Sequence, residues 1–420
     1  MRSKLNNIYN NKIVVNFFHI GIIKFSNVFA KYFLVSYLIR ALGEHNYGTL
    51  TWIESFIQYF VVFINFGFDI FIVKKIIEKI DDKLETDKII STVLTLKFLL
   101  FLSSFFIMAV LLYVFDIKEF SKYFFLMLCI GIGDVFFPLW YFQGIQKMKF
   151  LSITTLIAKG VLIIGTYLFI KNPNHIFRYI YILLFSSIIY GFLGIYFLVK
   201  ISKVKFLFAK KIELLKYFSD GFLFYLGKTS TLFMNFGTIF IIGKLFTKNL
   251  VSGFDLSSKI IFVFVFLFEV IQQSFFPSIV SSQDKNKLVK LLTATIILAL
   301  AFNIFVYFFS AELLNLLGGQ AIIKYDYLLR ELSILIPIIA ITTILGSCGL
   351  VAFGGIHKFN YSFLISAFLY LLSIFVSNKL GFLTFQNLVF LRISVDFIMA
   401  LIIVLFSIQI GLFKEIKSKK

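Results

Sequence analysis

Long apolar stretches alternate with short polar breaks along the whole chain. A helix needs roughly 20 predominantly apolar residues to cross about 30 Å of hydrocarbon, and windows of this kind recur from one end of the sequence to the other. The pattern therefore predicts an all-α integral membrane protein with twelve transmembrane helices. The predicted spans cover residues 13–39, 50–73, 89–114, 122–143, 150–170, 177–199, 217–243, 254–280, 288–310, 328–353, 358–377 and 386–413.

Two short motifs recur in the same order in both halves of the chain. FQGIQKMKF, which follows the fourth span, resembles FGGIHKFNY after the tenth span, and Gly144 and Gly355 stand 211 positions apart. IRALGEHNYG after the first span resembles GKLFTKNLVSG after the seventh. A repeat of six spans, an even number, keeps the same orientation in the membrane. We therefore expect two parallel six-helix repeats around a central cavity.

The densest run of lysines lies between these repeats, in KISKVKFLFAKKIELLK. Apolar and basic residues alternate in this run, which is typical of an amphipathic stretch at a membrane surface. The predicted organisation is an N-terminal lobe over residues 1–199, a cytoplasmic basic linker over 200–216, and a C-terminal lobe with a basic tail over 217–420.

Composition and charge support a membrane location. Hydrophobic residues make up 60% of the 420 positions and charged residues only 15%, which is too apolar for a soluble domain of this length. When a basic residue among the first three positions of a span is counted with the adjacent break, 24 of the 41 Lys and Arg residues fall at the N-tail, the even-numbered breaks and the C-tail, 10 at the opposite breaks and 7 inside spans. This asymmetry predicts that both termini are cytoplasmic. It also explains the net charge of +20 without nucleic-acid binding.

Charged and amide side chains inside the spans are the candidate functional residues. Each basic residue at mid-bilayer costs roughly 2.5 to 3.5 kcal/mol when it faces lipid, so these side chains must face protein or a wet cavity. Two acid–base pairs have the i, i+4 spacing of structural ion pairs. These pairs are Asp255 with Lys259 and Arg392 with Asp396.

The remaining polar positions divide by charge. Four lysines have no acidic residue three or four positions away, which favours contact with an anionic group such as phosphate or pyrophosphate. With two asparagines they form the candidate substrate site: Lys24, Lys31, Lys159, Lys228, Asn27 and Asn235. The acidic residues are candidates for coupling transport to H⁺ or Na⁺: Glu54, Asp69, Asp220 and Glu269. The two cysteines, Cys129 and Cys348, support neither a metal site nor a disulfide framework, and we expect no cofactor.

Several motifs resemble a known family. The polar first span, LIRALGEHNYG at Leu38 to Gly48, NFGFD at Asn65 to Asp69, and WYFQGIQKMKF after the fourth span stand in the order and spacing of the Wzx-type polysaccharide flippases. These belong to the multidrug, oligosaccharidyl-lipid and polysaccharide exporter superfamily. The resemblance implies translocation of undecaprenyl-pyrophosphate-linked oligosaccharide from the cytoplasmic to the periplasmic leaflet of a bacterial inner membrane, with an ion gradient as driving force. It implies no enzymatic activity.

Two alternatives stay open from the sequence. A multidrug exporter of the same superfamily would use acidic residues such as Asp69, Glu54 and Glu269 to capture cationic drugs. An O-antigen polymerase would need a large periplasmic loop, and no predicted break is long enough. As partners we expect the lipid-linked oligosaccharide, membrane lipids and polysaccharide assembly proteins, and no nucleic acid.

Overall fold

Helices form all of the regular structure in the described part of the chain. The computed structural model describes the backbone of residues 2–413 and the side chains of residues 34–413, except 70, 223, 230 and 231. Eight helical segments of this part are long and apolar enough to cross a membrane, and Phe233–Leu245 is a shorter apolar helix. The all-α membrane fold class is thus confirmed, and the exact number of twelve spans stays a prediction.

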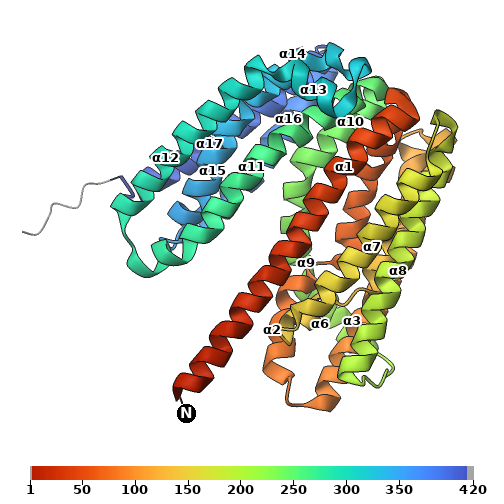
Figure 1. Cartoon of the computed structure of the whole chain (residues 1–420), viewed down its shortest axis with the longest axis vertical. Helices are drawn as coiled ribbons and strands as arrows, with labels where there is room; N and C mark the ends of the chain where they lie inside the picture. Colours follow the sequence, from red (N-terminus) through yellow and green to blue (C-terminus); the bar gives the residue numbers. More distant parts are fainter. Residues whose placement is uncertain (1, 414–420) are drawn as a thin grey trace, which may run out of the picture. The chain divides into compact units, whose positions relative to one another are not determined.

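Contacts within the chain divide it into a first unit, Met1–Leu232, and a second unit, Phe233–Lys420 (Figure 1). The first unit contains α1 (Arg2–Asn65), α2 (Phe68–Lys79), α3 (Lys83–Val114), η1 (Lys118–Phe120), α4 (Ser121–Leu128), α5 (Gly131–Phe136), α6 (Leu139–Gly144), α7 (Met148–Phe169), η2 (Pro173–His175), α8 (Ile176–Ser202) and α9 (Lys211–Leu232). The second unit begins with the π-helical turn η3 (Phe233–Gly237) and α10 (Thr238–Leu245).

The rest of the second unit is also helical. It contains α11 (Lys248–Ser282), α12 (Lys285–Phe308), α13 (Ser310–Gly318), η4 (Gln320–Tyr325), α14 (Asp326–Ser333), α15 (Leu335–Thr343), the π-helical turn η5 (Ile344–Val351), α16 (Ile356–Lys379) and α17 (Phe385–Gln409). In each unit the buried side chains form their own apolar cores, one around Trp140 and Phe142 and another around Leu345 and Ile403.

The unit boundary differs from the lobe boundary expected from the sequence. We assigned residues 217–243 to the C-terminal lobe, whereas the structure groups α9 with the first unit, because α9 packs against α1, α2 and α3. The predicted linker is also attached to the first unit. The main-chain N–H of Lys205 donates to Asp87 (3.2 Å) and that of Leu207 donates to Ser91 (3.0 Å), while Phe208 is fully exposed.

Two helix breaks occur where the sequence places a glycine or a proline. Gly43 has left-handed φ (78°) with non-helical ψ (162°), and it interrupts α1 within the predicted break between the first two spans. Pro138 separates α5 from α6, because proline has no N–H to continue the helix and its ring clashes with the preceding turn. The kink expected at Pro138 is therefore a complete break.

The two units share local features that support a duplication. Asp82 and Asp284 each cap the helix that follows a predicted cytoplasmic break, by accepting two main-chain N–H groups. Gln146 and Gly354 each have positive φ (55° and 83°) two residues before a helix. These two residues are 208 positions apart, not the 211 of the motif match. The positions that correspond in backbone conformation are therefore Gln146 and Gly354, whereas the alignment of the two motifs pairs Gly144 with Gly355.

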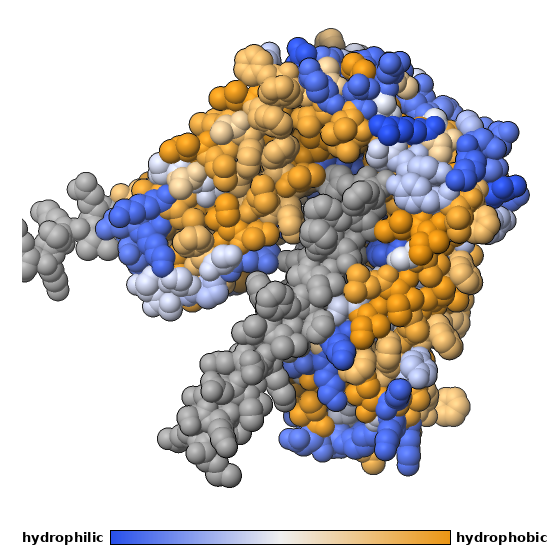
Figure 2. All heavy atoms as spheres, in the orientation of Figure 1, coloured by the Kyte–Doolittle hydropathy of each residue, from blue (hydrophilic) through white to orange (hydrophobic). Residues whose placement is uncertain are grey.

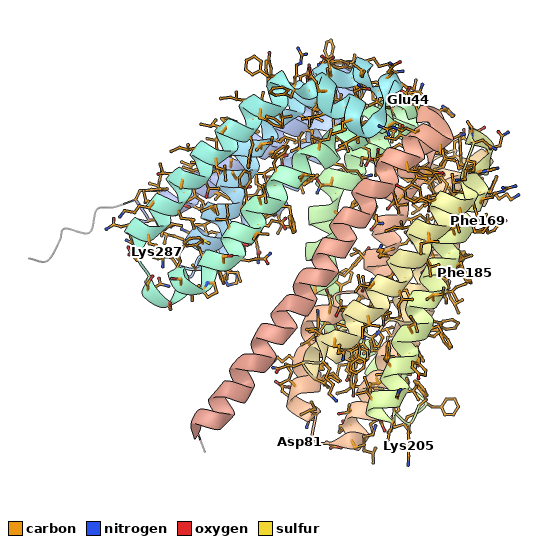
Figure 3. All side chains as sticks on the ribbon, in the orientation of Figure 1. Glu44, Asp81, Phe169, Phe185, Lys205 and Lys287 are labelled. Atoms are coloured by element: carbon orange, nitrogen blue, oxygen red, sulfur yellow. The ribbon has the colours of Figure 1, made fainter. Side chains whose placement is uncertain are left out.

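Successive breaks between the helices lie at opposite ends of the first unit, as the predicted topology requires. Figure 3 places Asp81 and Lys205, from two predicted cytoplasmic breaks, at one end of this unit, and Glu44 and Phe169 toward its other end. In the space-filling view, apolar residues cover the sides of its long helices and polar residues gather near their ends (Figure 2). This is the surface expected of a multi-pass membrane protein.

Candidate functional site

The motif NFGFD forms a sharp turn between α1 and α2. Two consecutive residues, Phe66 (φ 44°) and Gly67 (φ 77°), adopt left-handed backbone angles between the helices. Such a conformation costs about 1 kcal/mol or more at a non-glycine residue, and the complete burial of Phe66 offsets it. A Cβ atom on Gly67 would lie 2.5 Å from Cβ of Phe224, so only glycine fits there.

This turn packs tightly on α9. The ring of Phe66 stacks on Phe218 and Tyr225 of α9, with centroid distances of 4.7 and 5.1 Å. On the α9 side, a Cβ atom on Gly221 would lie 2.7 Å from the Phe66 ring. Glycine on each side thus lets the turn and the helix approach closely, and the α2–α9 interface is held by aromatic stacking.

Two ion pairs of opposite polarity lie along the α2–α9 interface. Nζ of Lys228 in α9 lies 2.5 and 2.6 Å from the two carboxylate oxygens of Asp69 in α2. Further along the interface, Nζ of Lys75 in α2 lies 2.9 Å from Asp220 in α9 and 4.0 Å from the centre of the Tyr217 ring. The two pairs specify an antiparallel alignment of the helices.

A buried set of polar groups lies behind the turn. Lys97 of α3 is only 1% exposed, and its ammonium donates to the main-chain carbonyl of Asp134. In a regular helix that carbonyl would accept from residue 138, but Pro138 has no N–H. Lys97 therefore satisfies an acceptor that the helix break leaves unpaired. The amide of Asn65, at the end of α1, donates to the Asp134 carboxylate (3.4 Å).

These groups and the Asp69–Lys228 pair form one electrostatic network. Lys97 lies within electrostatic range of Asp134, Asp69 and Lys228, and Lys159 of α7 lies within range of Asp134. We call these five charged residues the first-unit charge network. With three lysines and two aspartates, it carries a formal net charge of +1. Such an arrangement can hold an anion.

The second unit contains a separate and neutral polar cluster. Arg392 pairs with Asp396, and both side chains are buried (8% and 4% exposed). Arg392 also donates to the side-chain oxygen of Asn235 (3.1 Å), which lies in the π-helical turn η3. The Thr238 and Tyr370 hydroxyls lie 2.7 Å apart nearby in this unit. Every charge in this cluster has a partner, which indicates a packing role.

The structure places the other sequence-predicted residues as follows. Lys259 pairs with Asp255 along α11 (2.5 Å). Glu54 and Lys159 are half-buried in the first unit, and Glu269 is exposed on α11 of the second. The side chains of Lys24, Asn27 and Lys31 lie outside the described residues.

Sequence reasoning separated Asp69 and Lys228 into different roles, whereas the structure joins them. It also left out Lys97 as a site residue. The available signal was that Lys97 is the one charged residue in the predicted span 89–114.

A groove between α7 and α8 has a different character. It has a volume of about 400 Å³ and is lined by apolar and aromatic side chains, among them Phe169 and Phe185. Both of these rings are exposed (57% and 58%). A surface of this kind suits contact with hydrocarbon chains, and it offers nothing to hold a charged head group.

A family model described as "Polysaccharide biosynthesis protein" matches residues 13–283, well over half of the chain. The chain belongs to the polysaccharide biosynthesis protein family. This confirms the resemblance to polysaccharide flippases found in the sequence. Two relatives carry the name "Putative O-antigen transporter". The one from Escherichia coli (strain K12) is 21% identical over 77% of this chain and 79% of the relative. The one from Shigella dysenteriae is 23% identical over 83% and 89%.

Solved structures of other transporters share the fold of this chain. One is described as the inward-facing conformation of a multidrug resistance MATE family transporter of the MOP superfamily. It is 15% identical, with a TM-score of 0.72 over 94% of this chain and 96% of that one. Another, the lipid II flippase MurJ in an inward closed conformation, is 16% identical, with a TM-score of 0.68 over 93% and 87%. The family and the fold are those of transporters and flippases, not of enzymes.

Proposed function

We propose that this protein is a flippase that moves a pyrophosphate-linked oligosaccharide lipid across the bacterial inner membrane, from the cytoplasmic to the periplasmic leaflet. The observation that carries the proposal is the first-unit charge network, where lysines outnumber aspartates. Membership of the polysaccharide biosynthesis protein family supports the same substrate class. The E. coli relative, named as an O-antigen transporter, supports it further.

The network suits an anionic head group for electrostatic reasons. A lysine ammonium forms charge-assisted hydrogen bonds with phosphate oxygens, which are roughly twice as strong as neutral ones. Lys228 is 30% exposed at its side chain, so a ligand can reach it, and Lys159 adds a second half-buried cation. We include Lys24, Lys31 and Asn27 as further candidates for the head group, on their sequence positions alone, whereas Asn235 accepts from Arg392 in the neutral cluster of the second unit.

We further propose that an H⁺ or Na⁺ gradient drives transport, with both termini in the cytoplasm. Glu54, Asp69, Asp220 and Glu269 are the candidate coupling residues because each is a carboxylate within a predicted span. A protonophore should stop transport if H⁺ couples, whereas a sodium ionophore should stop it if Na⁺ couples. Transport that continues in the presence of both would reject gradient coupling.

A multidrug exporter is the second candidate, favoured by exposed Glu269 on α11. The two functions are separated by complementation of a flippase-null strain. Wild-type protein should restore surface glycan, and Lys228→Ala and Lys24→Ala should restore much less at equal expression. Lys74→Ala, at a side chain that is 81% exposed, is the control and should behave as wild type. Full restoration by both lysine variants would rule out the anion site, and drug resistance without glycan would favour the exporter.

A further inference from the structure

The Asp69–Lys228 ion pair has features of a contact that exchanges partners. We propose that Asp69 is an internal counter-ion of Lys228, that an anionic pyrophosphate head group displaces it, and that this displacement loosens α2 from α9. The proposal rests on the proposed flippase function and deepens it. It assigns Asp69 the role of setting which anions are strong enough to enter, in addition to the ion-coupling role proposed above.

The geometry of the pair resembles that of a bound phosphate. Both carboxylate oxygens of Asp69 lie within hydrogen-bond distance of the Lys228 ammonium, at 2.5 and 2.6 Å. Two oxygens of a phosphate group can occupy the same positions around the lysine. The carboxylate therefore occupies the place that the head group needs, and the two compete for it.

Exposure allows this pair to exchange partners, and its place beside Lys97 distinguishes it from the Lys75–Asp220 pair, whose side chains are similarly exposed (28% and 39%). The side chains of Asp69 and Lys228 are 31% and 30% exposed, so water and a ligand can reach both. By contrast, the side chains of Arg392 and Asp396 are 8% and 4% exposed. Separating a buried pair leaves uncompensated charges, whereas a half-buried pair that water reaches separates more readily.

Lys97 can compensate the carboxylate of Asp69 after it has left Lys228. After displacement, the carboxylate of Asp69 still lies near a positive charge, because Lys97 is within electrostatic range of both Asp69 and Lys228. Lys97 is itself fixed by its bond to the Asp134 carbonyl. The aspartate can thus leave Lys228 without becoming an isolated charge.

The position of Asp69 links anion binding to helix movement. Asp69 lies in the first turn of α2, two residues after the left-handed pair Phe66 and Gly67. Without its bond to Lys228, this end of α2 is held on α9 by ring contacts, those of Phe66 with Phe218 and Tyr225 and that of Phe71 with Phe224. The opposite-polarity pair of Lys75 and Asp220 remains further along the interface. Displacement therefore frees the start of α2 and keeps its other end attached.

The test measures binding of inorganic pyrophosphate to the full-length protein in nanodiscs of zwitterionic lipid. Asp69→Asn removes the competitor and should tighten binding about fivefold, which corresponds to the ~1 kcal/mol of an exposed pair. Lys228→Gln should weaken binding. Asp326→Asn is the matched control, because it neutralises a carboxylate of equal exposure (31%) in another ion pair, and it should leave the affinity unchanged.

A second measurement uses the wild-type protein alone, in case Asp69→Asn does not fold. Pyrophosphate should speed hydrogen–deuterium exchange of the main chain over residues 66–73, and unchanged or slower exchange there overturns the inference.

The outcomes also separate this inference from the proposed function. If Lys228→Gln weakens binding but Asp69→Asn fails to tighten it, the anion site stands and the counter-ion role is wrong. Equal tightening by Asp326→Asn would likewise overturn the counter-ion role. If wild-type protein binds no pyrophosphate, both the anion site and the inference are rejected.

Discussion

Replacing Lys97 by Met should destabilise the first unit strongly. Methionine keeps most of the side-chain volume and removes the ammonium, which is 1% exposed and donates to the carbonyl of Asp134. That carbonyl cannot be satisfied by the helix because Pro138 follows four residues later. The variant therefore leaves a buried acceptor without its donor, and it leaves the carboxylate of Asp134 without its buried cation.

The expected magnitude follows from these two losses. A buried carbonyl left without its donor costs about 1 to 3 kcal/mol in unfolding free energy, and a carboxylate that loses a nearby cation adds to this cost. We expect Lys97→Met to lose about 3 kcal/mol or more. The double variant Lys97→Met/Asp134→Asn removes the uncompensated charge and should recover about 2 kcal/mol.

The assay is reversible unfolding of the purified protein in mixed detergent micelles, analysed as a double-mutant cycle. Lys88→Met is the control, since Lys88 lies on the same helix α3 with its side chain 39% exposed, and it should change stability by less than about 0.5 kcal/mol. Equal losses of stability in Lys97→Met and Lys88→Met would show that the Lys97 ammonium is not needed by the Asp134 carbonyl. Additive effects of Lys97→Met and Asp134→Asn would show that these two residues do not interact.

Some structural features were readable from the sequence because they depend on local chemistry. Apolar length predicted the helical membrane fold, and a proline predicted the interruption at residue 138. The spacing of Arg392 and Asp396 brings these residues together on one helix face.

The site required contacts that no local pattern contains. Asp69 and Lys228 stand 159 positions apart, and their meeting depends on how α9 packs on the turn before α2. For the same reason, sequence reasoning assigned α9 to the other lobe. Lys97 escaped notice because its partner is a main-chain carbonyl, and no side-chain spacing reveals such a partner.

The remaining predictions address the α2–α9 interface and the linker. Gly221→Val should push the Phe66 ring off α9, because even a Cβ atom would lie 2.7 Å from it. We expect a loss of about 1 to 3 kcal/mol in the unfolding assay, and wild-type stability would contradict the close packing. Asp87→Ala removes the acceptor of the Lys205 N–H, so exchange of that amide should accelerate; unchanged protection would show that the linker is held otherwise. Lys210→Ser lies on the exposed linker, and we predict near-normal glycan export in complementation, whereas a severe loss would show that the linker does more than connect.

The central claim is tested most directly by flipping in proteoliposomes. A fluorescent undecaprenyl-pyrophosphate-linked sugar is placed in both leaflets, and a membrane-impermeant quencher reports how quickly the inner pool reaches the outer leaflet. Wild-type protein should raise the rate far above that of protein-free vesicles, Lys228→Gln should abolish most of the increase, and Lys74→Gln should retain it. A wild-type protein that leaves the rate at the protein-free level, while it transports a cationic dye, would contradict the account.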